Sequence, residues 1–299
     1  MARYVIGYVP GGAYANGISY LELSDTMHIR GYGHASCSTS DEALTWLFDE
    51  QKVSPNDVIC AGIDTLMSWA TVGTFRPMDY FLKQEYPEVE NLIFSVNSAY
   101  GAMAIHGMVF AHALIRCAPH IHFINESHPK VAYYAQTGFW HDYLTRTDQL
   151  NIDPKESHES ARWTCNKMFN EVGAVRMWKE LLQWINHDAG YSMVQSSDIT
   201  IPIDDSEWDA LYSAWFTYHL GFRSTCRDLM KLEEQGLLTI NLSTDQSSRI
   251  KLLRQRFAGE DQSIVRMMEN RIIIPCELEE KVKYLWLPAS AGDANERFT

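Results

Sequence analysis

Carboxylate side chains stand at three points of this chain where regular segments end or begin. Asp64 and Glu126 each follow or close a short apolar run, and Asp209 lies near the start of an amphipathic segment typical of a helix. Carboxylate oxygens are the ligands that Mg²⁺ and Mn²⁺ prefer. Two such ions about 4 Å apart can activate a water molecule and neutralise a phosphoryl group. The pattern therefore predicts a divalent-metal site for phosphotransfer chemistry, with Asp64, Glu126 and Asp209 as metal ligands.

Further acids on the same predicted helix extend this set. Asp205 precedes Asp209 by four residues, so both side chains are expected on one helical face, where one binds the ion while the other orients a ligand or accepts a hydrogen bond from water. Asp204 is an equivalent candidate, and the sequence does not choose between it and Asp205. Acids in a first helical turn also interact favourably with the helix dipole, and this explains Asp204 and Asp205 equally well.

His128 is a candidate for an assisting role beside Glu126. It could donate a hydrogen bond to a phosphate or to the Glu126 carboxylate. A histidine that merely precedes the helix beginning at Pro129 is nearly as good an explanation. For Asp64, metal binding and capping of the following loop are evenly balanced.

The elements that must position these residues follow a recognisable order. Runs at residues 3–9, 17–23 and 27–32 predict three strands joined by short turns, as in an antiparallel meander. The pattern then predicts a helix from residue 40, a buried strand at 57–63, helices at 78–85 and 97–117, a strand at 121–125, and helices at 129–137, 155–187 and 205–220. This order favours an α/β fold with a mixed sheet and crossover helices.

This arrangement resembles the RNase H-like fold, and the fragments are similar to those of an uncharacterised family of predicted RNase H-like nucleases, related broadly to Holliday-junction resolvases. The resemblance covers residues 3–220, and its most specific parts are Glu126-x-His128-Pro129 and Asp209-Ala210, with Gly62-Ile63-Asp64 beside them. It implies a divalent-metal-dependent nuclease that hydrolyses nucleic-acid phosphodiester bonds. The metal ligands would be Asp64, Glu126 and Asp209, with Mg²⁺ or Mn²⁺ as the cofactor.

One position departs from the family pattern. The family's first strand ends in an acid before a glycine-rich turn, and Val9 stands there in the segment VIGYVPGG. In RNase H-like enzymes that acid bridges the metal ions, and valine cannot ligate a cation. The departure leaves two interpretations: a weak or altered nuclease, and a non-catalytic RNase H-like subunit that binds a protein or a nucleic acid.

The remaining chain is expected to add to this core. Residues 1–221 are predicted as the RNase H-like domain, with a helical insertion at residues 139–200. Residues 222–299 are predicted as a mostly helical extension packed on it, with a strand at 283–287.

Composition limits the other possibilities. The net charge of −13 argues against a general nucleic-acid coat, although it does not exclude a nuclease whose acids hold metal. No apolar stretch is long enough for a membrane span, and we expect no signal peptide before the first strand. None of the six cysteines lies within four residues of another, which indicates reduced thiols in a cytoplasmic protein.

A nucleic acid, a protein partner or a second copy of the chain remain candidate partners. A small-molecule phosphohydrolase or sugar-kinase-like enzyme is a weaker alternative, since no phosphate loop is recognisable.

Overall fold

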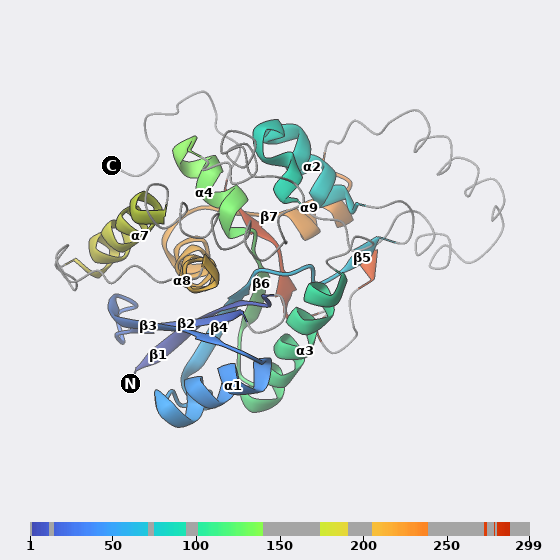
Figure 1. Cartoon of the computed structure of the whole chain (residues 1–299). Coiled ribbons are helices and arrows are strands. Elements are labelled where there is room, and N and C mark those ends of the chain that lie inside the picture. The colour runs from blue at the N-terminus through green and yellow to red at the C-terminus, as the bar shows by residue number, and fades with distance from the viewer. Residues whose placement is uncertain are drawn as a thin grey trace, which may run out of the picture.

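The computed structural model describes residues 2–11, 15–70, 75–93, 101–139, 174–190, 205–238, 272–273, 278 and 280–287. Its centre is a six-stranded mixed sheet with the strand order β3-β2-β1-β4-β6-β9 (Figure 1). The six strands are β1 (Arg3–Val9), β2 (Asn16–Leu23), β3 (Ile29–Cys37), β4 (Val58–Ile63), β6 (Phe123–Glu126) and β9 (Val282–Lys283). Neighbours β1, β2 and β3 are antiparallel, whereas β1, β4, β6 and β9 are parallel. The predicted α/β class and mixed sheet are confirmed.

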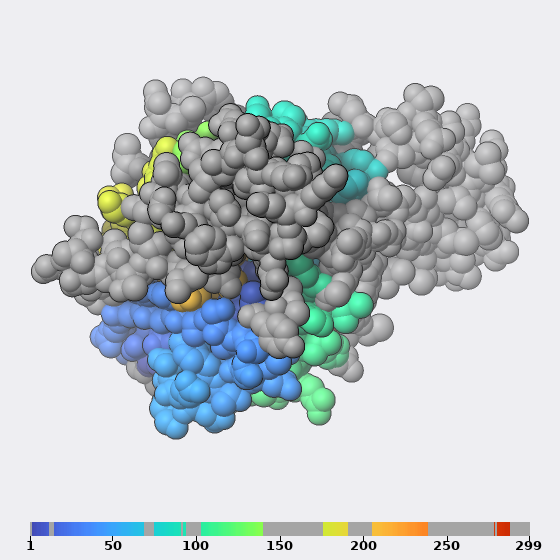
Figure 2. All heavy atoms as spheres, viewed as in Figure 1, coloured from blue at the N-terminus to red at the C-terminus, as the bar shows by residue number. Residues whose placement is uncertain are grey.

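Helices cover both faces of this sheet. The helices are α1 (Ser40–Thr45), α2 (Pro77–Glu85), α3 (Gly101–Cys117), α4 (Pro129–Thr137), α7 (Ala174–Ala189), α8 (Asp205–Tyr218) and α9 (Leu229–Glu234), with π-helical turns η1 (Trp46–Glu50) and η5 (His219–Arg223) and 3-10 turns η2 (Pro55–Asp57) and η3 (Pro87–Leu92). Figure 1 shows α8, α4 and α7 on one side of the sheet and α1 and α3 on the other. In the space-filling view, the blue N-terminal strands and α1 form a continuous surface next to the green α3 (Figure 2).

The parallel register brings the carboxyl ends of three strands to one edge of the sheet. Tyr8 of β1 lies opposite Ile63 of β4, and Ile63 lies opposite Glu126 of β6. The backbone N–H of Asp64 donates to the Tyr8 carbonyl at 2.9 Å, so Asp64 is held directly beyond the sheet edge. These short strands are buried along nearly their whole length, which explains their continuous apolar sequences.

Glycines in β1 and β4 allow the backbone of α8 to lie in direct contact with the sheet. A Cβ atom at Gly7 would lie 1.9 Å from the Ala210 carbonyl oxygen, and one at Gly62 would lie 2.3 Å from the Ser213 carbonyl oxygen. Only glycine fits such contacts, because a methyl group needs more than 3 Å. Tyr8, which points to the opposite face from Gly7, stacks on Phe110 of α3 with ring centroids 3.7 Å apart.

The third strand and the C-terminal extension differ from expectation. β3 continues to Cys37 rather than ending at residue 32, because pairing with β2 continues through Gly33 and Ser36 despite their weak strand propensity. Part of the extension enters the sheet itself, since β9 pairs in parallel with β6. Its other described strands form two small sheets, in which β5 (Trp69–Ala70) pairs with β8 (Ile272–Ile273) and β7 (Arg227–Asp228) pairs with β10 (Leu285–Trp286).

Some predicted elements fall on parts of the chain that are not described. Within the predicted insertion the structure describes residue 139 and residues 174–190, which include helix α7. The predicted start of the helix at 97–117 lies outside the described residues, and α3 is described from Gly101. Across the described parts of the chain, every helix is too short or too polar to traverse a lipid bilayer.

We predict that Gly62→Ala destabilises the protein by about 1–3 kcal/mol, because the new methyl group must push α8 away from β4. The matched control is Gly31→Ala in β3, where a Cβ would meet nothing closer than 3.6 Å. The control is expected to change stability by less than about 1 kcal/mol. Chemical denaturation measures both, and equal losses for the two variants would contradict close helix–sheet packing as the cause.

Candidate active site

A lysine joins the two predicted acids of α8. Lys130, in the first turn of α4, places its Nζ 2.6 Å from Asp205 Oδ2 and 2.9 Å from Asp209 Oδ2. Asp209 is 3% exposed, whereas the Asp205 side chain is 40% exposed and marks the solvent side of the cluster. Asp64 lies close enough for its charge to affect the pKa of Asp209. We call Asp64, Asp205, Asp209 and Lys130 the open cluster.

The electrostatics of the open cluster show an excess of negative charge. Burial raises the pKa of Asp64 to about 6, against the opposing effect of His128 and Lys130. Burial also raises the pKa of Asp209 well above its usual range, with the charges of Asp205 and Asp64 adding to the effect and Lys130 opposing it. The Asp209 Oδ1 atom is buried and has no hydrogen-bond partner. The pair Asp64 and Asp209 therefore holds a proton more readily than ordinary aspartates do.

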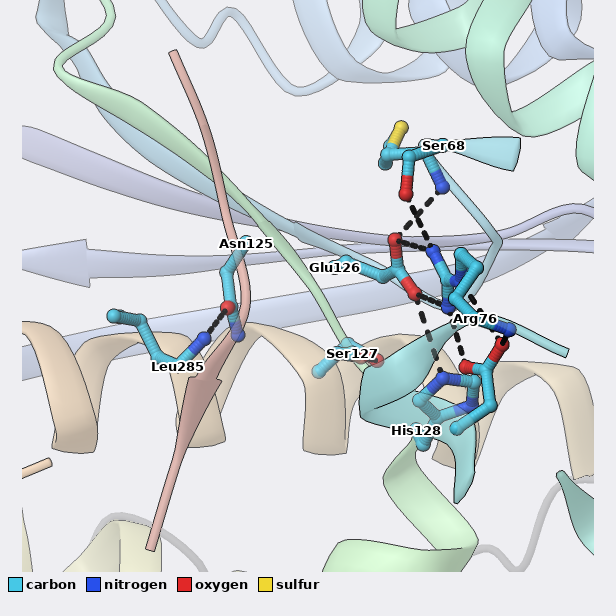
Figure 3. A network of polar contacts seen from close by, with 10 residues as sticks. Ser68, Arg76, Asn125, Glu126, Ser127, His128 and Leu285 are labelled. Atoms are coloured by element: carbon cyan, nitrogen blue, oxygen red, sulfur yellow. Dashed lines mark hydrogen bonds and ion pairs between the residues drawn. The ribbon is translucent and has the colours of Figure 1, made fainter. Parts of the chain in front are cut away.

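Glu126 lies in a second, closed cluster beside the first. Arg76 donates to both oxygens of its carboxylate, from Nη1 to Oε2 at 2.8 Å and from Nη2 to Oε1 (Figure 3). The backbone N–H of Met67 donates to Oε2 at 2.8 Å. Burial opposes ionisation of Glu126, but the charge and hydrogen bonds of Arg76, aided by His128, lower its pKa to about 2. Glu126 is therefore a carboxylate at every ordinary pH, and its oxygens face a guanidinium.

Asp79 and His128 complete the closed cluster. Asp79, in the first turn of α2, accepts from Arg76 Nε and Nη2 and from the Arg76 backbone N–H. The Nε2 atom of His128 lies 3.6 Å from Glu126 Oε1 and makes no hydrogen bond. Among the described residues, Asp79, Glu126 and His128 are the single group of three whose ligand atoms lie within 4.8 Å of one another.

The structure thus divides the predicted site residues between two clusters. Asp64, Asp205 and Asp209 gather in the open cluster, while Glu126 and His128 belong to the closed one. Asp204 lies outside the described residues. Val9, at the end of β1 and 4% exposed, contributes an aliphatic side chain to this edge of the sheet.

Sequence reasoning missed three charged members of the clusters. Lys130 directly follows the His128-Pro129 pair, so its place on the first turn of α4 was recognisable. Arg76 and Asp79 flank the proline that begins α2, and an acid three residues after a helix cap is a known start signal. The long distance along the chain from Arg76 to Glu126 gave no local signal of their contact.

The open cluster suits one divalent cation. Its three carboxylates and one ammonium leave two negative charges when all are ionised, and Asp209 Oδ1 is a buried oxygen that lacks a partner. Mg²⁺ commonly binds through one or two carboxylates and completes its shell with water and substrate phosphate. Asp64 and Asp209 fit that description.

Comparison of this chain with protein-family models, with curated proteins and with solved structures gave no match. Inference about its chemistry therefore rests on the residues and geometry of the two clusters.

We predict that Asp64→Asn stabilises the protein at pH 7.5 and has little effect at pH 4. Between the ordinary aspartate pKa of 3.8 and the folded-state pKa of about 6, the folded protein binds more protons than the unfolded chain. The stability due to this group therefore falls as pH rises through that window. The gain at pH 7.5 is expected to be about 1–2 kcal/mol, since Asp64 is partly exposed and solvent screens it. Denaturation in chelator-containing buffer measures it, and an equal effect at both pH values would contradict the assignment.

Proposed function

We propose that this protein is a metal-dependent phosphodiesterase of RNase H-like fold that cleaves nucleic acid at the open cluster. The observation that carries the proposal is that Asp64, directly after β4, lies close enough for its charge to affect Asp209 of α8, whose second oxygen is buried and makes no hydrogen bond. These two residues would hold one Mg²⁺ or Mn²⁺ ion. When bound, such an ion polarises a phosphoryl oxygen and lowers the pKa of a water molecule.

Lys130 and Asp205 would assist at the same site, through positive charge and solvent access respectively. Lys130 holds a positive charge that pairs with both Asp205 and Asp209. Its burial favours the neutral amine, but Asp205 and Asp209 outweigh this and raise its pKa well above the usual range. Lys130 therefore stays charged and can stabilise negative charge that develops on a phosphate. Asp205, the most exposed acid of the cluster, faces incoming water or substrate.

Binding of the ion should be linked to proton release. Asp64 and Asp209 have raised pKa values because burial and mutual repulsion disfavour two charges. A divalent cation held by these two residues would offset that penalty and favour the ionised forms. Metal affinity and activity are therefore expected to rise with pH from about 5 to 7.

The alternative is a non-catalytic RNase H-like subunit that binds a protein or a nucleic acid. The specific observation in its favour is that protein cations already neutralise part of the acid set. Lys130 contacts both α8 acids, Arg76 contacts both oxygens of Glu126, and Val9 supplies no ligand at the end of β1. A protein built this way is expected to bind its partner with no dependence on a divalent ion.

The test is cleavage of labelled single-stranded DNA, duplex DNA, RNA and a four-way junction in the presence of Mn²⁺. We expect cleavage by the unmodified protein, and a loss of about 100-fold or more in Asp64→Asn and in Asp209→Asn. The matched control is Asp49→Asn, which removes the same charge from an exposed position in η1 and is expected to leave the rate unchanged. Binding of these substrates without cleavage, equal with Mn²⁺ and with chelator, would instead support the non-catalytic alternative.

A further inference from the structure

Arg76 uses every hydrogen-bond donor that its side chain has. A guanidinium carries five N–H groups. Nε donates to Asp79 Oδ2 at 3.0 Å, Nη1 donates to Ser68 Oγ at 2.9 Å and to Glu126 Oε2 at 2.8 Å, and Nη2 donates to Asp79 Oδ1 at 2.7 Å and to Glu126 Oε1. Figure 3 shows the guanidinium enclosed by these acceptors. The side chain is fully buried, so its position is set by the two carboxylates and Ser68.

Two of the acceptors of Arg76 belong, with His128, to a group that has the composition of a metal-ligand set. Asp79, Glu126 and His128 offer two carboxylates and an imidazole, with ligand atoms within 4.8 Å of one another. His128 is 7% exposed, and its Nε2 atom has no hydrogen-bond partner although it lies 3.6 Å from Glu126 Oε1. A buried imidazole nitrogen that makes no hydrogen bond, and only a 3.6 Å contact with one carboxylate, is an arrangement that a divalent cation satisfies.

A cation already lies among these ligands, and it is part of the chain. Asp79 and Glu126 bring two negative charges into a region with no solvent exposure, and Arg76 brings one positive charge that pairs with both. The guanidinium also lies 5.8 Å from the centre of the Tyr284 ring, which favours a cation at this position. Unlike a bound ion, Arg76 cannot dissociate when the ion concentration falls.

We propose that Arg76 is a built-in cation that takes the place of a divalent ion at Asp79, Glu126 and His128. This group becomes a metal site when the guanidinium is removed. The consequence for catalysis, a single exchangeable ion at the open cluster, rests on the proposed function. The role of Arg76 in the closed cluster is independent of the proposed function.

The test compares Mn²⁺ binding by the full-length protein and its variants, measured by calorimetry and by electron paramagnetic resonance of free Mn²⁺. We expect Arg76→Ala to bind one Mn²⁺ ion per chain more than the unmodified protein. Adding Glu126→Gln to Arg76→Ala should remove the extra ion. Guanidinium ion at about 10 mM, far below denaturing concentrations, should compete with it. Arg227→Ala, which removes the same charge from an exposed position in β7, should gain no ion.

Loss of Arg76 leaves two buried carboxylates without a counter-charge, so a second measurement covers an Arg76→Ala protein that does not fold on its own. In that case Mn²⁺ is expected to restore its circular dichroism spectrum and cooperative unfolding, whereas Mg²⁺-free and Mn²⁺-free samples stay unfolded. An Arg76→Ala protein that gains no ion, or that Mn²⁺ does not refold, would overturn the proposal. The count for the unmodified protein tests the open cluster separately: no bound ion there would contradict the proposed function while leaving the role of Arg76 intact.

Discussion

Two carboxylates without solvent exposure, Asp79 and Glu126, place the strongest constraint on this structure. Moving a carboxylate from water into a protein interior costs several kcal/mol, and only a well-placed partner with good hydrogen bonds offsets that cost. Arg76 provides this partner for both acids at once. Because Asp79 begins α2 and Glu126 ends β6, the guanidinium ties the helix that follows β5 to the centre of the sheet. Removing one member of such a buried network typically costs about 3–5 kcal/mol, so the three residues must act as a unit.

The position of the open cluster depends on a second constraint, the close approach of α8 to the sheet. Gly7 and Gly62 leave room for the helix backbone above β1 and β4. This approach brings Asp209, one turn after the start of α8, close to the carboxyl end of β4. Asp64 directly follows that strand. The same face of α8 continues as a polar row into the core, where Ser213 bonds to Ser127 at 2.7 Å. Backbone packing therefore places the acids of α8 at the sheet, where Lys130 pairs with both of them.

Much of the fold could be predicted because its signals are local. The antiparallel meander, the buried strand before Asp64 and the helix Pro129–Thr137 follow from apolar runs, turn residues and the left-handed Gly138 that ends the helix. The edge strand β3 was harder, since hydrogen bonding to β2 rather than side-chain pattern extends it. The candidate ligands could be chosen by residue type, but their division into two clusters could not. That division depends on the contact of Arg76 with Glu126, 50 residues away along the chain, and on the contact of Lys130 with Asp205, 75 residues away.

The two clusters differ in how their charge is balanced, and this difference gives them different chemical roles. In the closed cluster, a fully buried guanidinium with no spare donor offsets one of the two acid charges and hydrogen-bonds both carboxylates, so nothing in it responds readily to solvent or ligand. In the open cluster, one ammonium group pairs with two of the three carboxylates. The excess negative charge is reduced by proton uptake, because the pKa values of Asp64 and Asp209 are raised. A site whose charge is unbalanced and reaches solvent can bind a cation and later release it. The closed cluster therefore supports the architecture, and the open cluster carries the capacity for ion exchange that the proposed catalysis would require.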